Sequence, residues 1–220
     1  MGPTEHAIEP ADFPLAEHFS DPEQQLGASK LGMWLFLATE VLLFGGLFCA
    51  YVVFRSLHPA AFAECHELLD WKLGALNTVI LLISSLTVAL SIRSAQLGHR
   101  TGIKVNLALT ILCACAFLFF KWYFEWPEKF AHGYLPGYHF VGDVKDPDQA
   151  HIFFGLYFLM TGLHAAHVVI GIGVLGWLLW RTQQGHFGSS YWQPLELGGL
   201  YWHIVDVIWI FLFPLFYLAG

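Results

Sequence analysis

Five acidic or histidine side chains lie inside long apolar runs of this sequence. They are Glu40, His164, His167, His203 and Asp206. All but His203 fall within roughly 4 Å of the middle of their runs, at a helical rise of about 1.5 Å per residue. A carboxylate at mid-bilayer costs about 2.5–3.5 kcal/mol on insertion scales. Glu40 and Asp206 are therefore expected to face protein or water and to need partners.

The spacing of these residues predicts two small polar faces. His164 and His167 are three residues apart, as are His203 and Asp206, so each pair can lie on one side of a helix. No lysine or arginine lies at the depth of Glu40 in any apolar run. We therefore expect Glu40 to be protonated or hydrogen-bonded to one of these histidines.

Three kinds of site could use the histidines. A bis-histidine haem needs His164 or His167 and His203 at equal depth, but their levels differ by several ångströms. A copper or zinc site could use His164, His167 and Asp206, although no further donor lies at that depth. A metal-free, hydrogen-bonded polar cluster that holds the helices together is the favoured interpretation.

The composition is that of a membrane protein. Of 220 residues, 56% are hydrophobic and only 12% are charged, whereas soluble domains have about 25% charged residues. The net charge of -7 leaves no basic surface for a nucleic acid. The four cysteines have no C-x-x-C spacing, which argues against zinc and covalent haem.

Five apolar runs predict an all-α bundle of five transmembrane helices. Each run reaches the length of about 20 residues with which a helix crosses a bilayer, and none alternates like a barrel strand. An acidic, proline-rich arm, residues 1–30, is expected to precede one membrane domain, residues 31–219, and residues 125–151 to form an irregular external connection. The predicted helices span residues 31–54, 73–92, 105–124, 152–180 and 197–219.

The basic residues favour a cytoplasmic N-terminus and an external C-terminus. The short loop after the second run holds Arg93, Arg100 and Lys104 without an acid, and such loops stay inside. On the same side, Arg181 and His186 follow the fourth run beside tryptophans, surroundings typical of an anionic lipid head group. Arg181 as an ordinary interfacial anchor is the alternative.

Three segments resemble subunit III of the haem–copper cytochrome c oxidases. Residues 31–46, LGMWLFLATEVLLFGG, resemble its glutamate-bearing helix. Residues 157–171, YFLMTGLHAAHVVIG, resemble its T-G-x-H-x-x-H-V-x-x-G helix, and residues 201–212, YWHIVDVIWIFL, resemble its C-terminal helix. The two helices that precede the glutamate-bearing helix in the seven-helix form are missing, so the chain is similar to the short, five-helix bacterial form.

The resemblance implies a non-redox subunit III of a terminal oxidase in aerobic respiration. Such a subunit packs on subunit I in a complex that also contains subunit II, supports proton uptake and holds structural phospholipids. The haem and copper of this proton-pumping complex belong to partner subunits, and no cofactor is expected in this chain. The polar residues at the motif positions are then not catalytic. The expected location is a bacterial inner membrane.

Other functions fit parts of this pattern. The chain could be subunit III of a quinol oxidase or a homologue that accompanies nitric oxide reductase. Subunit II binds the electron donor, so the sequence of this chain does not distinguish these alternatives. A rival of another class is a haem-carrying membrane anchor or an independent transporter. A Soret band in the isolated chain would favour the haem anchor.

Overall fold

The structure, a computed structural model, describes residues 16–17, 19–136, 140, 142, 144–189 and 191–218. Five of the helices in these residues are long and apolar enough to cross a membrane, which confirms the predicted all-α bundle. The spanning helices are α1 (Pro22–Leu57), α3 (Trp71–Gln96), α4 (Arg100–Phe119), α6 (Pro147–Gln183) and α7 (Gln193–Tyr217). Shorter elements are α2 (Pro59–Glu67), the π-helix η2 (Phe120–Glu125) and α5 (Trp126–Ala131).

Several helices extend beyond the predicted apolar runs. Residues 22–30, predicted as part of an extended arm, are the first turns of α1, whereas residues 1–15 lie outside the described part of the chain. The Asp21 carboxylate caps α1 by accepting from the N–H of Gln24 at 2.7 Å. The connection over residues 125–151 is helical at both ends, where it contains α5 and the start of α6. Proline explains these differences, because its fixed φ suits the first turn of a helix as well as a loop.

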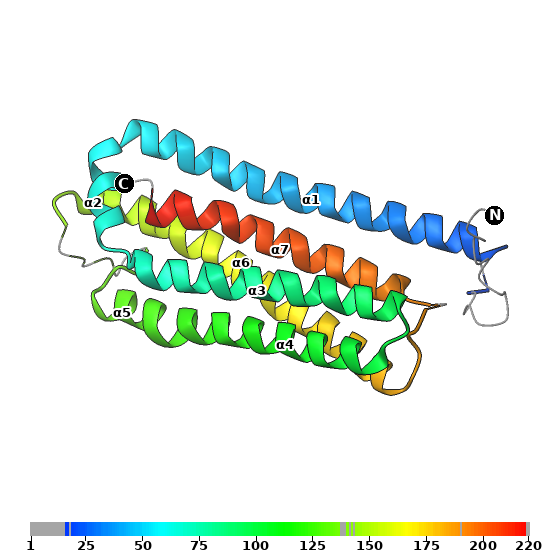
Figure 1. Ribbon diagram of the computed structural model, residues 1–220. Helices are drawn as coiled ribbons and strands as arrows, with labels where there is room; N and C mark the ends of the chain where they lie inside the picture. The colour runs from blue at the N-terminus through cyan, green and yellow to red at the C-terminus, as the bar shows by residue number, and fades with distance from the viewer. Residues whose placement is uncertain are drawn as a thin grey trace, which may run out of the picture.

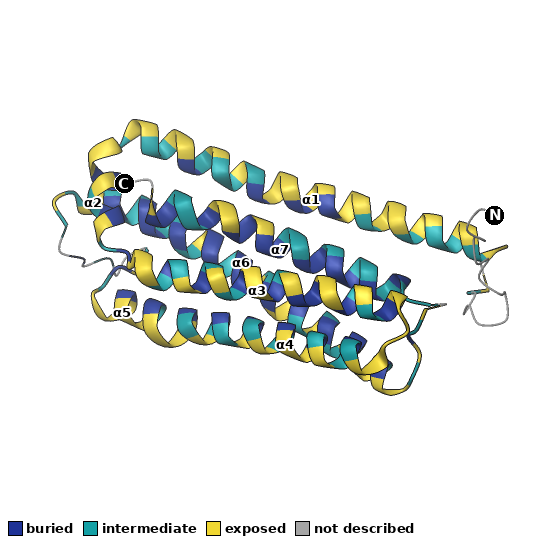
Figure 2. Ribbon diagram, viewed as in Figure 1, coloured by how far each residue is buried: buried dark blue, intermediate teal, exposed yellow. Residues whose placement is uncertain are grey.

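The packing surrounds α7 and leaves α1 at the edge. α7 contacts α1, α3 and α6, while α4 packs between α3 and α6 (Figure 1). α7 is the most buried of the spanning helices and α1 the least, as the long exposed strip of α1 in Figure 2 shows. Trp202 and Trp209 of α7 are completely buried and form the centre of the core.

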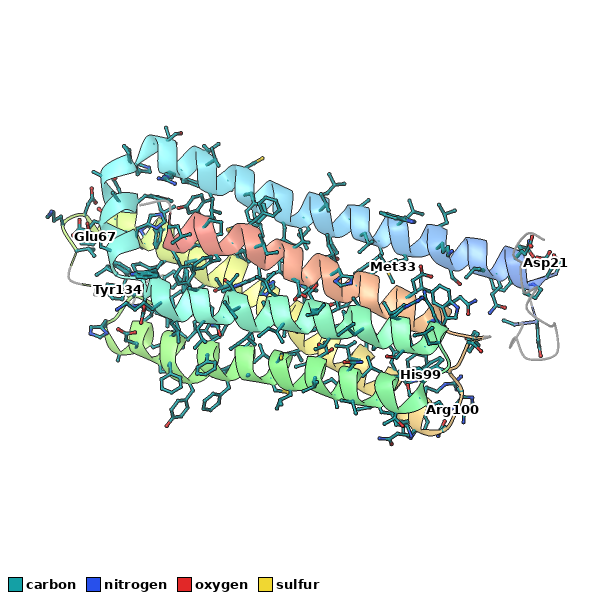
Figure 3. The ribbon with its side chains drawn as sticks, in the orientation of Figure 1. Asp21, Met33, Glu67, His99, Arg100 and Tyr134 are labelled. Atoms are coloured by element: carbon teal, nitrogen blue, oxygen red, sulfur yellow. The ribbon has the colours of Figure 1, made fainter. Side chains whose placement is uncertain are left out.

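The connections group at two ends of the bundle. α2, α5 and the last turn of α7 lie together at one end, which we call the C-terminal end (Figure 1). The start of α1 and the turn between α3 and α4 lie at the other, N-terminal end. Figure 3 places Glu67 and Tyr134 at the first of these ends and Asp21, His99 and Arg100 at the second. This arrangement agrees with an odd number of membrane crossings.

Candidate functional site

Glu40 and His167 form a polar pair between α1 and α6. Glu40 Oε2 lies 2.9 Å from His167 Nε2, and the two side chains are only 11% and 12% exposed. The other ring nitrogen, Nδ1, lies 2.8 Å from the Leu163 carbonyl oxygen. A carbonyl only accepts, so Nδ1 carries a hydrogen. Nε2 is therefore either the unprotonated nitrogen of a neutral ring beside Glu40 or part of an imidazolium that forms an ion pair with the Glu40 carboxylate. The contact is close but does not have the angles of a hydrogen bond, and Glu40 Oε2 has no hydrogen-bond partner among the described residues.

Aromatic residues at helical spacing hold this pair in place. Phe36, Glu40 and Phe44 are four residues apart on α1 and so lie on one face. The Phe44 ring meets the His167 ring edge-on at 5.5 Å, and Phe36 stacks on Tyr201 of α7 at 5.8 Å. The Tyr201 hydroxyl donates to the His167 carbonyl at 2.9 Å. Glu40 thus lies beside a histidine, as a 2.9 Å contact between α1 and α6. The contacts of Phe36 and His167 with Tyr201 add α7 to this group.

The other predicted polar residues have separate surroundings. His164 is completely buried, with its ring 5.5 Å from Phe117 and 5.2 Å from Trp209. His203 Nδ1 lies 2.8 Å from the Ser85 hydroxyl oxygen. Neither ring nitrogen of His164 and neither carboxyl oxygen of Asp206 has a hydrogen-bond partner among the described residues. The five residues therefore do not form one cluster, and His203 and Asp206 do not bond to each other.

The histidines are not arranged as a metal site. In the described part of the chain, no group of three or more His, Cys, Asp or Glu side chains is placed to hold a metal ion. His167 is engaged with Glu40, whereas His164 lies among aromatic rings. The copper or zinc set of His164, His167 and Asp206 does not assemble in this geometry.

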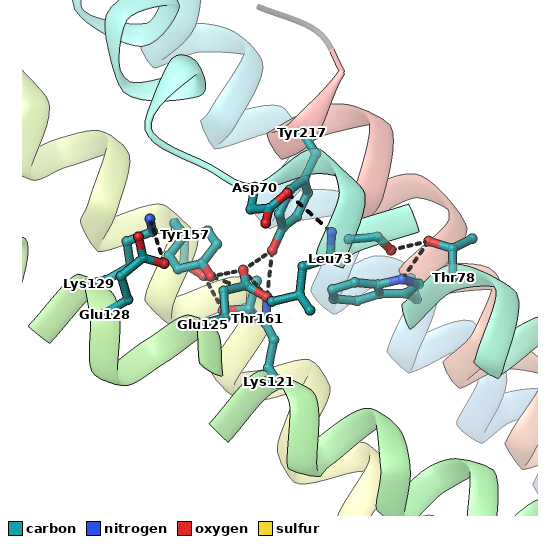
Figure 4. Close-up of polar contacts among 12 residues, drawn as sticks. Asp70, Leu73, Thr78, Lys121, Glu125, Glu128, Lys129, Tyr157, Thr161 and Tyr217 are labelled. Carbon is teal, nitrogen blue, oxygen red and sulfur yellow. Dashed lines mark hydrogen bonds and ion pairs between the residues drawn. The ribbon is translucent and has the colours of Figure 1, made fainter. Parts of the chain in front are cut away.

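A second buried polar cluster, absent from the sequence-based prediction, lies near the C-terminal end. Lys121 of η2 is 2% exposed, and its Nζ donates to Glu125 at 2.7 Å, to the Tyr157 hydroxyl at 3.2 Å and to the Tyr217 hydroxyl at 2.6 Å (Figure 4). Both tyrosine hydroxyls also donate to Glu125 Oε1. The Trp209 ring centre is 5.0 Å from the same Nζ. These contacts connect η2 to α6 and α7.

Lys121 lies near the end of the apolar run 105–124, a position that does not by itself indicate burial. The signal that could have revealed the pair is the i,i+4 spacing of Lys121 and Glu125. The depth of the pair depends on the tyrosines of two other helices, which the local sequence does not show.

The short helix α2 is held by a chain of hydrogen bonds. The Tyr51 hydroxyl lies 2.8 Å from His66 Nε2 and donates to the Leu215 carbonyl at 2.8 Å. Since the hydroxyl has one hydrogen, Nε2 of His66 is the donor to Tyr51. Burial, and then the positive charge of Arg55, lowers the pKa of His66, which favours this neutral ring.

The predicted lipid-binding residues lie at the N-terminal end of the bundle. The Arg181 guanidinium lies over the Trp177 ring at 5.6 Å, and His186 Nε2 is 3.1 Å from Gln184 Oε1. The Arg100 side chain also lies close to this loop. A Cβ atom added to Gly185 would be only 3.2 Å from the Arg100 guanidinium. Three basic side chains therefore gather around the end of α6.

Comparison with known proteins gives consistent matches along the chain. A family model described as cytochrome c oxidase subunit III matches residues 23–220. A cytochrome c oxidase subunit 3 of Thermostichus vulcanus is 31% identical over 86% of each chain. A probable quinol oxidase subunit 3 of Staphylococcus haemolyticus is 32% identical over 87% of this chain and 89% of its own length. A haem–copper oxidase subunit I+III of Aeropyrum pernix is 29% identical over 92% of this chain and 24% of that longer protein.

The pairing of Glu40 with His167 can be tested by substitution. Glu40→Gln should retain stability, because its amide can donate to Nε2 of a neutral His167. Glu40→Ala should lower the free energy of unfolding by about 1–3 kcal/mol, the cost of an unsatisfied buried polar group. Thermal unfolding in mild detergent measures both, with Thr39→Ala as the control on the exposed face of α1. Equal destabilisation by Gln and Ala would instead indicate an ion pair that the amide cannot replace.

The Lys121–Glu125 pair should show strong coupling between its members. Lys121→Met alone should destabilise the protein by about 3–5 kcal/mol, because it leaves a buried carboxylate without its cation. Adding Glu125→Gln should recover most of that loss, since the amide still accepts from the tyrosines without a charge. A double-mutant cycle in thermal unfolding measures the coupling. Additive losses would show that the two side chains act independently.

Proposed function

Because the chain belongs to the cytochrome c oxidase subunit III family, we propose that it supports the catalytic subunit of a haem–copper oxidase without holding haem or copper itself. The observation that carries this proposal is the pairing of Glu40 from the first motif with His167 from the second. This pair uses the motif residues to hold helices together. The proposed role is to stabilise subunit I and to support its proton uptake, while the redox groups lie in partner subunits.

The surroundings of the histidines support a role without redox chemistry. Both ring nitrogens of His167 are engaged, Nδ1 with the Leu163 carbonyl and Nε2 in the close contact with Glu40, and His203 uses Nδ1 for Ser85. His164 is enclosed by Phe117 and Trp209. A haem iron or copper ion needs imidazole nitrogens that converge on one point, which favours a structural role for these residues.

Subunit I is the direct partner in this proposal. The fused relative carries both subunits in one chain, as its name states, which supports a position of the present chain beside subunit I. Subunit II and phospholipids complete the proposed surroundings. Arg181, His186 and Arg100 form a basic group that suits an anionic lipid head group at the membrane surface.

The electron donor is cytochrome c or quinol, and the relatives include subunits of both kinds of oxidase. The name of the Staphylococcus haemolyticus relative favours quinol as the second candidate. A nitric-oxide-reductase partner remains the more distant alternative. The copper content of a co-purified subunit II distinguishes the first two, since cytochrome c donors require a copper site there and quinol donors do not.

The purified chain tests the proposal directly. When the chain is isolated from its native membrane in mild detergent, we expect a haem-containing subunit to co-purify and the complex to show a Soret band. The same chain, produced alone as the matched control, should show no such band. Haem bound stoichiometrically by the isolated chain would contradict the non-redox role.

We place the chain in a bacterial inner membrane with its N-terminus inside, on the evidence of the basic loop between α3 and α4. A reporter enzyme fused after Gly220 should be active only in the external compartment. A fusion in the turn at Gly98, which shares the N-terminal end of the bundle with the start of α1, serves as the internal control. A cytoplasmic signal from the fusion after Gly220 would reverse the orientation.

A further inference from the structure

His203 occupies an unusual place in the membrane domain. It lies five residues from Ile208, the middle of the apolar run 197–219, and so roughly 8 Å from the middle of that run but still inside it. Its ring is half-buried. Nδ1 is used by Ser85, and Nε2 has no hydrogen-bond partner among the described residues. One polar atom thus reaches toward the outside of the bundle inside the apolar run of residues 197–219.

Two other polar side chains that reach the outside of the bundle near this depth have partners within the chain. Thr39, near the middle of α1, is exposed, but its hydroxyl donates to the Phe36 carbonyl at 2.6 Å. His167 is partly exposed and is paired with Glu40. Histidines inside membrane helices normally face the bundle interior or pair with other groups. His203 follows this rule through Nδ1 only.

The surface around His203 is apolar. Leu82 and Leu86 of α3 are 48% and 59% exposed, and Val207 and Ile210 of α7 are each 42% exposed. Together with His203 they form what we call the α3–α7 face. α7 lies between α1 and α3 (Figure 1), and a groove of about 220 Å³ between α1 and α7 borders this face. Lipid tails cover such a surface well but offer no hydrogen bond to an imidazole.

We propose that the α3–α7 face is a subunit interface, on which a membrane-spanning helix of the neighbouring oxidase subunit bonds a polar side chain to Nε2 of His203. The inference rests on the proposed function, which supplies that neighbour. The face is apolar except for one imidazole nitrogen, and this combination distinguishes a protein helix from lipid or water as its occupant. Lipid head groups lie about 15 Å from the middle of a hydrocarbon core of about 30 Å, which leaves roughly 7 Å between them and the level of His203. The leucines and valine around His203 offer no polar lining for water. A protein helix brings both apolar contact and a hydrogen-bonding group to this depth.

Site-specific photo-crosslinking in the assembled complex locates the interface. A benzophenone amino acid at Leu86 should join this chain to another oxidase subunit. The same probe at Leu112, which is 64% exposed on α4, is the matched control and should react chiefly with lipid. Capture of lipid alone at Leu86, or of a second copy of this chain, would overturn the proposal, as would equal capture of the subunit at both positions.

Two substitutions of His203 test the hydrogen bond itself. Asparagine reaches only the position of Nδ1, whereas glutamine reaches the position of Nε2. With the catalytic subunit immobilised, His203→Asn should lower retention of this chain about tenfold, the change that corresponds to about 1.4 kcal/mol, and His203→Gln should restore it. The thermal unfolding of the isolated chain should not change with His203→Asn, because the bond to Ser85 remains.

An error in the proposed function and an error in the proposed interface would give different experimental results. If the proposed function is wrong, no oxidase subunit co-purifies with the unmodified chain. If only the interface is wrong, the complex forms, and both His203 variants are retained as well as the unmodified chain. In that case the Leu86 probe also captures lipid, so a folding defect in one variant does not decide the outcome.

Discussion

Hydrocarbon gives a buried polar side chain nothing to bond, so several polar groups of this bundle take partners from other helices. Three such connections organise the molecule. Glu40 joins α1 to His167 of α6, Tyr51 joins α1 to the end of α7, and the Lys121–Glu125 pair joins η2 to α6 and α7. α1 is the least buried spanning helix, so two of the three connections act where apolar packing is weakest. The polar contacts determine the position of α1 against the bundle and also contribute to the stability of its packing.

The number and positions of the spanning helices were predictable, because each apolar run carries its own local signal. The ends of the helices were less so. Pro22 and Pro147 indicate a break in the chain when read alone, but each occupies the first turn of a helix. The same residue type is compatible with both structures, and capping residues such as Asp21 decide between them. α2 lies in a stretch too short for an apolar period to be detected.

Depth along the helices was the part of the site that the sequence revealed best. It predicted a histidine as the partner of Glu40, but it did not choose among His164, His167 and His203. Three residues along an α-helix leave two side chains about 60° apart, and this rotation is enough to turn His167 toward α1 and His164 toward Phe117 and Trp209. Rotation about a helix axis depends on the neighbouring helices, which are distant in sequence. The burial of Lys121 has the same non-local origin.

The position of α1 also constrains the order in which the protein can be assembled in a cell. A ribosome makes α1 first, yet the helices it contacts most are α6 and α7, the last two to be synthesised. During most of translation α1 is therefore in the membrane without the helices it packs against, and Glu40 lacks its contact with His167. Closure of the bundle is a late event that requires the final helices. A nascent chain that stalls before α6 emerges carries an unpartnered acid in its first transmembrane helix, which gives membrane quality control a chemical mark of an unfinished subunit.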